Sequence, residues 1–88
     1  MQDSYNGYAS SPMSPAENCF AIIPSDALEL AEATKGLYVG MGGDVTLRSL
    51  HGQSDVKFVN VPSGAILDVR ARAVRATGTT ASGIVGLA

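Results

Sequence analysis

Short apolar runs separated by turn-forming residues make up most of the chain after residue 18. The runs are rich in β-branched and aromatic residues, and glycine, proline, serine or aspartate closes them, which is typical of short β-strands. They lie at 19–23, 37–39, 45–50, 56–61, 65–75 and 82–88. About six short strands at this spacing predict an all-β domain, built as a small antiparallel β-sandwich or barrel.

The most regular alternation lies between Leu67 and Ala73. Apolar residues occupy every second position there, and charged residues occupy the positions between them. A period of two predicts a strand, here the longest of the chain, with one face on the core. The charged positions on and after this strand are Asp68, Arg70, Arg72 and Arg75. The arginines are expected to share a face, which is either solvated or paired with carboxylates of a neighbouring subunit. In both cases Asp68, on the same face, is expected to be their nearest local partner.

Residues 26–35 and 40–44 carry two further local signals. Good helix formers follow the candidate N-caps Ser25 and Asp26, so one short helix is expected at 26–35, provided that it packs on the strands. Glycines at 40–44 predict a hairpin turn, because tight hairpins need positive φ angles. This loop lacks the Lys-Ser/Thr pair that opens a helix in phosphate-binding loops.

Residues 1–18 differ from the rest in composition, being rich in Ser, Pro, Asn, Gly and Ala. Such a segment buries too little apolar surface to order itself, which predicts an extended or disordered arm ahead of a single β domain at 19–88. Tyr5 and Tyr8 lie three positions apart in the arm. They either belong to a free terminus or anchor the arm on a neighbouring subunit, since aromatic rings are enriched at interfaces.

The composition indicates a domain that is supported by other subunits. Apolar residues make up 45% of the chain and charged residues 16%, with a mean hydropathy of +0.16. A core this small is marginal without disulfides, metals or oligomerisation. Cys19 is the only cysteine and His51 the only histidine, which excludes an internal disulfide and a Cys/His metal cluster. We therefore expect a homo-oligomer, with Cys19 packed as a small buried hydrophobe and His51 in an exposed loop.

Several function classes are disfavoured by the residues present. The net charge is −2 and the six basic residues are spread out, which argues against a nucleic-acid surface. No apolar run approaches the roughly 20 residues of a membrane span, and the N-terminus lacks the features of a secretory signal peptide. Dispersed carboxylates, a lone histidine and the absence of a nucleophile elbow predict no enzyme, no metal and no cofactor.

Two interpretations from different classes remain. One is a small carbohydrate-binding β module, for which Tyr5, Tyr8 and Tyr38 would be the only stacking faces. The other is a structural assembly module, which needs no catalytic group and which accounts for the apolar surplus. A closed ring of such modules would also cover exposed strand edges.

Six segments of the β domain carry recognisable strand and turn motifs. They are FAIIPSD at 20–26, KGLYVG at 35–40, GGDV at 42–45, VKFVNVPSG at 56–64, VRARAV at 69–74 and ATGTTA at 76–81. Over residues 20–88 the chain thus resembles the small spike base proteins of tailed phages and gene transfer agents. The resemblance implies a non-enzymatic virion structural protein that sits on a capsid vertex as a symmetric ring and carries a head spike or fibre.

The same resemblance implies the partners and the location of the chain. The partners would be the capsid protein and the fibre or spike protein, and the location would be the virion, after synthesis in the host cytoplasm. A capsid cement or decoration protein and a tail adaptor are the alternatives within this class.

Overall fold

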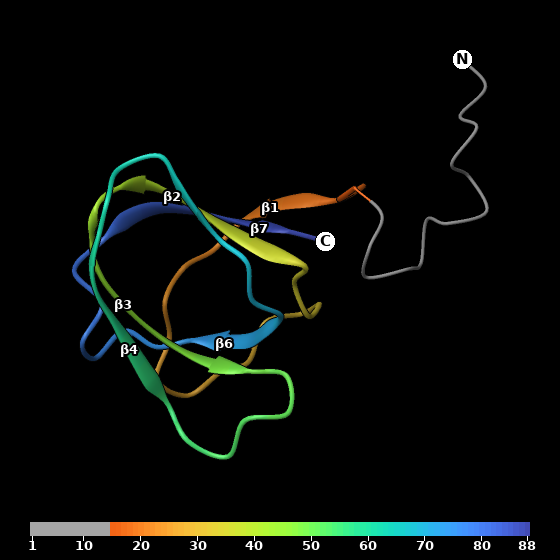
Figure 1. The fold of residues 1–88 in the computed structure, drawn as a ribbon. Coiled ribbons are helices and arrows are strands. Elements are labelled where there is room, and N and C mark those ends of the chain that lie inside the picture. The colour runs from red at the N-terminus through yellow and green to blue at the C-terminus, as the bar shows by residue number, and fades with distance from the viewer. Residues whose placement is uncertain (1–14) are drawn as a thin grey trace.

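The computed structural model describes residues 15–88, and these residues form seven β-strands and no helix. The strands are β1 (Cys19–Ala21), β2 (Gly36–Met41), β3 (Gly43–Ser49), β4 (Val56–Val61), β5 (Ala65–Leu67), β6 (Ala71–Val74) and β7 (Ser82–Leu87). All pairings are antiparallel and build two sheets, sheet A in the order β1-β7-β2-β5 and sheet B in the order β4-β3-β6 (Figure 1). The predicted all-β class is confirmed, with one strand more than expected.

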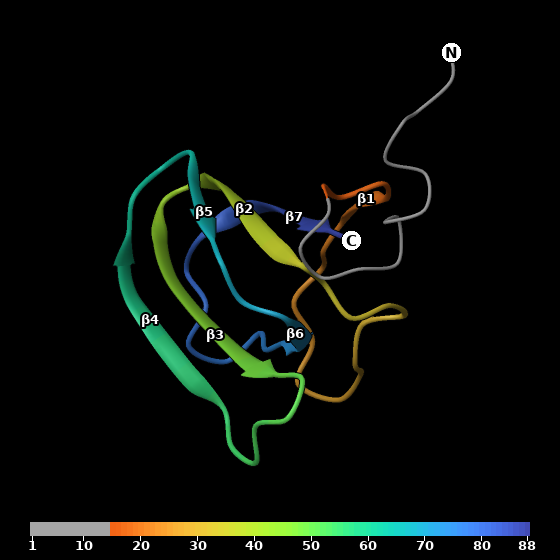
Figure 2. The ribbon, with the colours of Figure 1, turned by 45° about the vertical axis from the view of Figure 1, so that its right-hand side comes forward.

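The two sheets lie on either side of one hydrophobic core (Figures 1 and 2). Sheet A contributes Leu37 and Val39 from β2, and sheet B contributes Val45 and Leu47 from β3; none of the four is more than 1% exposed. These residues stand at alternate positions, so each strand turns its other side chains outward. The domain therefore has two outer faces, one on each sheet.

The segment that the sequence predicts as one long strand changes sheets in its middle. β5 pairs with β2 in sheet A, with Leu67 opposite Leu37, whereas β6 pairs with β3 in sheet B. Residues 68–70 connect them, and Val69 N donates to Leu67 O at 2.9 Å across the bend. The prediction of a single long strand was therefore wrong. The longest strand is β3, with seven residues. The alternation still describes burial correctly, because Leu67 and Val69 before β6 and Ala71 within it pack in one shared core.

The glycines near residue 42 form a corner between the sheets instead of the predicted hairpin. β2 and β3 follow each other directly but lie in different sheets, so they do not pair. A Cβ on Gly42 would meet the Val61 carbonyl oxygen and would lie 2.8 Å from Ser63 N. Gly42 therefore permits a close backbone approach that a side chain would block. A hairpin instead joins β3 to β4 through residues 50–55, where His51 is exposed as expected.

Residues 25–34, which we call the strap, lie along the edge of β6 where a helix was predicted. Three N–H groups of the strap donate to carbonyl groups of β6. The hydrogen bonds join Ser25 to Val74 (2.9 Å), Leu30 to Arg72 (2.8 Å) and Thr34 to Ala71 (3.0 Å). Ser25 Oγ accepts from Ala27 N and Leu28 N as a helix cap does, but no helix follows. The helix prediction was wrong because carbonyl groups at the edge of β6 accept hydrogen bonds from N–H groups that would otherwise bond within a helix.

Thr34 holds the strap in place from the inside. It is fully buried, and its Oγ1 donates to Val69 O at 3.2 Å and accepts from Ala71 N at 3.0 Å. One hydroxyl thus satisfies two backbone groups at the point where the chain enters β6. Losing it would leave buried polar groups without a partner.

The first and last described residues meet at one end of sheet A. Glu17 N and Asn18 N donate to Ala88 O at 2.6 and 2.8 Å, and Ala88 N donates to Asn18 O at 2.7 Å. The next residue, Cys19, is exposed, so its predicted burial was wrong. Its side chain stands on the outward side of β1, an edge strand of three residues.

Candidate interaction surfaces

Residues 15–88 hold no group of three or more His, Cys, Asp or Glu side chains that could bind a metal ion. A search of the same residues for a helix long and apolar enough to cross a membrane finds none. The carboxylates that are dispersed in the sequence are instead brought together with arginines over the outer side of sheet B.

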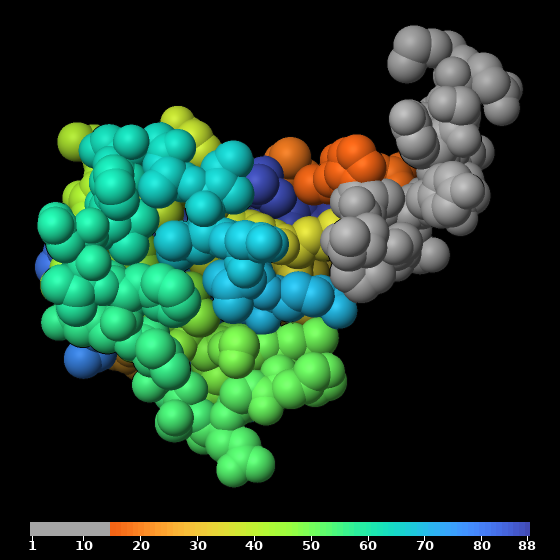
Figure 3. Space-filling model, viewed as in Figure 1, coloured from red at the N-terminus to blue at the C-terminus, as the bar shows by residue number. Residues whose placement is uncertain are grey.

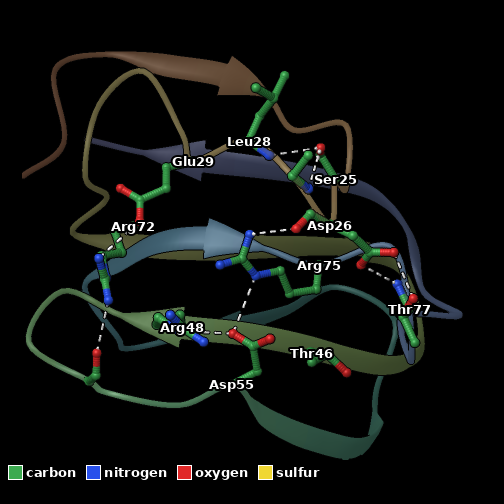
Figure 4. A network of polar contacts seen from close by, with 12 residues as sticks. Ser25, Asp26, Leu28, Glu29, Thr46, Arg48, Asp55, Arg72, Arg75 and Thr77 are labelled. Carbon is green, nitrogen blue, oxygen red and sulfur yellow. Dashed lines mark hydrogen bonds and ion pairs between the residues drawn. The ribbon is translucent and has the colours of Figure 1, made fainter.

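Within the described part of the chain, four ion pairs lie over sheet B and the segments that connect its strands. They join Arg48 to Asp55 (3.0 Å), Arg75 to Asp55 (3.3 Å), Arg72 to Glu29 (2.9 Å) and Lys57 to Asp44 (3.5 Å). Figure 4 shows Asp55 between Arg48 and Arg75, with Arg72 reaching Glu29 on the strap. We call the side chains of these four pairs the charged network.

Arg72 and Arg75 fasten the strap to sheet B. Arg72 bonds Glu29 through Nη1 and donates through Nη2 to Gly52 O in the β3–β4 loop, at 3.1 Å. The Arg75 side chain is only 12% exposed, and its Nη1 donates to Asp26 O at 3.3 Å. Both guanidinium groups are therefore used within the chain, where they join segments that are distant in sequence.

Asp26 and Asp44 extend these contacts to the segment that follows β6 and to β4 itself. Asp26 accepts from Thr77 Oγ1 at 2.7 Å and from Thr77 N at 2.9 Å, and these hydrogen bonds hold the pKa of its carboxyl group below the ordinary value of 3.8. The Asn60 N–H, at 3.0 Å, and the Lys57 ammonium likewise lower the pKa of Asp44. Both carboxylates are thus stabilised in the charged form by the folded chain.

Arg70 and Asp68 lie exposed on the bend between β5 and β6. Arg70 Nε donates to Thr34 O at 3.4 Å, which is a long and weak contact. None of the four ion pairs involves Asp68, so the prediction that it is the nearest partner of the arginines was wrong. Glu29 and Asp55, both distant in sequence, take that place.

Tyr5 and Tyr8, the predicted anchors of the arm, lie outside the described residues. A role in subunit contact for these tyrosines, and for Asp68, Arg70 and the two arginines after them, stays a prediction.

The outer face of sheet A carries apolar side chains from all four of its strands. Val85 on β7 is paired with Ala21 on one side and with Tyr38 on the other, and Tyr38 is paired with Ile66. Residues directly opposite in antiparallel strands turn their side chains to the same face. One continuous row of apolar side chains therefore crosses the sheet from β1 to β5.

A second row lies beside the first, two residues along each strand. Leu87 is paired there with Cys19 and with Gly36. A Cβ on Gly36 would lie 3.8 Å from Ile66 Cγ2 and 3.9 Å from Leu87 Cδ1, so these two side chains close over the glycine and join the rows. We call the outward residues of both rows the apolar face: Cys19, Ala21, Gly36, Tyr38, Ile66, Val85 and Leu87.

The apolar face is open to solvent in part. Ile66 is 64% exposed and Tyr38 39% exposed, and Cys19 and Ala21 are exposed as well. None of the residues that face outward on the paired positions of sheet A carries a charge. A contiguous exposed apolar patch of this kind marks an interaction site on a soluble protein.

Sequence reasoning missed the apolar face, because its members come from four strands and adjoin only through the sheet order. The sequence at 82–88 does indicate such a face, because apolar residues there occupy both sides of the strand. Ile84 faces the core, while Val85 and Leu87 face outward. A strand that is apolar on both sides is typical of one that is covered on both sides.

An all-β domain has the features of an assembly module when three of its four arginines pair with carboxylates of the same chain and an uncharged apolar face is left open. The chain is similar to a chain in the solved structure of the "capsid of native GTA particle computed with C5 symmetry", where GTA stands for gene transfer agent. The two are 40% identical, the alignment covers 99% of this chain and 100% of that chain, and the TM-score is 0.84.

The chain therefore belongs to the same family as this component of the gene transfer agent capsid, and it is a structural protein of the phage type. The resemblance noted in the sequence is confirmed at that level, and the match is consistent with a non-enzymatic role. No family model matches the chain, and no curated protein matches it either.

Proposed function

We propose that the chain is the subunit of a spike base, a symmetric ring that sits on a capsid vertex and carries a head spike or fibre. The observation that carries the proposal is the full-length similarity, at 40% identity, to a component of a capsid particle computed with C5 symmetry. Fivefold symmetry is the symmetry of a capsid vertex, and a closed ring around such an axis uses one repeated contact between neighbours.

The shape of the domain supports a role between several partners. Its two outer faces differ in chemistry, one apolar and one charged, so they are suited to different neighbours. The free edge of β4 is six residues long, and its Val56 and Val59 are 54% and 69% exposed. Figure 3 shows this green-to-cyan part of the chain at the surface. Contact with another subunit would cover an edge that otherwise invites aggregation.

The proposal is tested on particles from the organism that encodes the chain. A gold-labelled tag on the C-terminus is expected to appear at the capsid vertices in electron micrographs. Deletion of the gene is expected to leave closed capsids that lack vertex spikes. Label spread over the whole capsid lattice would identify a cement protein instead, and label at the tail would identify an adaptor; either result overturns the spike base.

A further inference from the structure

We infer that the apolar face receives residues 1–14 of a neighbouring copy of this chain. The inference rests on the proposed ring for the presence of that neighbour, and it assigns to the ring a particular contact. Each subunit would donate one segment and receive one, which fills every apolar face in a closed head-to-tail arrangement.

The chemistry of the donated segment matches that of the receiving face. Residues 1–14 contain one charged side chain, Asp3, and two of the three tyrosines of the chain. The apolar face has no charge to pair with a charged partner, and burying an unpaired charge against it would be costly. Tyrosine suits such a surface, because its ring buries a large apolar area while its hydroxyl stays at the rim.

The starting point of the segment also favours this occupant. Glu17 N and Asn18 N donate to Ala88 O, and Lys35 Nζ donates to Pro15 O at 3.4 Å. Between Asn18 and Pro15 the chain thus passes from the end of β7 to the start of β2, along the end of sheet A. The segment before Pro15 begins beside the sheet whose outer face is open.

The segment is long enough to reach another subunit. Residues 1–14 span at most about 50 Å when fully extended. The four strands of sheet A span only about 14 Å across, at about 4.8 Å between neighbouring strands. Within a ring, the tether raises the effective concentration of the segment, so that a weak contact between segment and face is sufficient.

The test is photo-crosslinking in the full-length chain. Tyr5 is replaced by p-benzoylphenylalanine, and this chain is mixed with an isotopically heavy chain of native sequence under conditions that allow subunits to exchange. Irradiation followed by mass spectrometry then identifies both the residue reached and the chain to which it belongs. We expect crosslinks between light and heavy chains at Tyr38, Ile66 or Val85.

Two charge substitutions in the heavy chain provide the comparison. Ile66→Glu, on the apolar face, is expected to reduce crosslinking between chains about tenfold, as loss of a central contact does. Leu28→Glu introduces the same charge at a strap residue that is 71% exposed, and it is expected to leave crosslinking unchanged. Thermal melts of both variants confirm that the subunit is folded in each.

The inference is overturned if the crosslinks stay within one chain, fall on the strap or sheet B, survive Ile66→Glu, or do not form between chains at all. Those outcomes are separate from the fate of the proposed function. If the chain forms a ring at the vertices but residues 1–14 crosslink elsewhere, this inference is wrong and the proposed spike base is unaffected. If the gold label is absent from the vertices, the proposed spike base function is wrong, whatever the crosslinks show.

Discussion

The outer faces of sheet A and sheet B differ in what their side chains contact. Over sheet B, arginines and carboxylates pair with one another within the chain, and they connect the strap, the β3–β4 loop and β6. Over sheet A, Tyr38 and Ile66 stand exposed in a row without charges. The more polar face therefore stabilises the folded subunit, whereas the apolar face is left to be covered by another chain.

The two faces differ because charged and apolar side chains find their partners in different ways. A charged side chain finds a partner within one folded chain, as Arg72 does with Glu29 at 43 positions' distance. Apolar side chains on the outside of a single sheet have no second layer above them. Their burial lowers the free energy only when another chain covers them and excludes water from their surface.

The largest expected effect is the loss of the Thr34 hydroxyl, on which the strap over sheet B depends. Thr34→Val should lower the free energy of unfolding by about 1 to 3 kcal/mol, because the buried Ala71 N–H and the partly buried Val69 carbonyl group lose their partner. Urea unfolding measures the change, and Thr34→Ser, which keeps the hydroxyl, should recover most of it. Equal stability of the Val variant and the native chain would show that the strap is not held in this way.

The next effect separates the two faces through assembly. Tyr38→Ala should raise the dissociation constant of the oligomer about tenfold, close to 1.4 kcal/mol, while changing subunit stability little. Arg70→Ala, on the exposed bend, should change it by less than about threefold, as exposed charges usually do. Sedimentation equilibrium measures both. A larger effect of Arg70→Ala would favour the charged interface that the sequence predicts.

A smaller effect is expected from the ion pair between the strap and β6. The coupling energy between Arg72 and Glu29 should be about 0.3 to 1 kcal/mol, because the pair is partly solvated, with side chains 31% and 51% exposed. A double-mutant cycle with alanine at both positions, read by urea unfolding, gives this value. A coupling energy of zero would remove this pair from the contacts that fasten the strap.

The smallest expected effect is the contribution of Asp26 to the pH dependence of stability. Its carboxyl pKa is lower in the folded chain than the ordinary 3.8, so its stabilisation is present above that value and is lost as the pH falls through the folded pKa. Asp26→Asn should flatten the decline in unfolding free energy below pH 3.8. Thr77→Val, which removes the largest cause of the shift, should flatten it in part. An unchanged decline in both variants would contradict the assignment.

The sequence predicted the strand content and the core well, because alternation reflects which side chains face inward. It correctly separated Leu67 and Val69 from Asp68 and Arg70, although the strand it assumed there is broken by a change of sheet. The prediction of a helix at 26–35 failed because helix propensity does not include the carbonyl groups of β6, which accept hydrogen bonds from the N–H groups of the strap.

The candidate interaction surfaces were harder to predict from the sequence, because their residues become neighbours only in the folded chain. Arg72 and Arg75 stood out as charges on a strand, but their partners Glu29 and Asp55 become neighbours only after folding. Ala21, Tyr38, Ile66 and Val85 did not stand out, because each is an ordinary strand residue until sheet order places them in one row.

The central claim, that subunits assemble through the apolar face and not through the charged network, is tested most directly by the mass of the full-length chain in solution. Light scattering at about 0.1 M and about 1 M salt compares conditions whose screening lengths are about 10 Å and about 3 Å. The account predicts an oligomer whose mass is the same at both salt concentrations. An oligomer that dissociates at high salt, or a monomer at both, would contradict it.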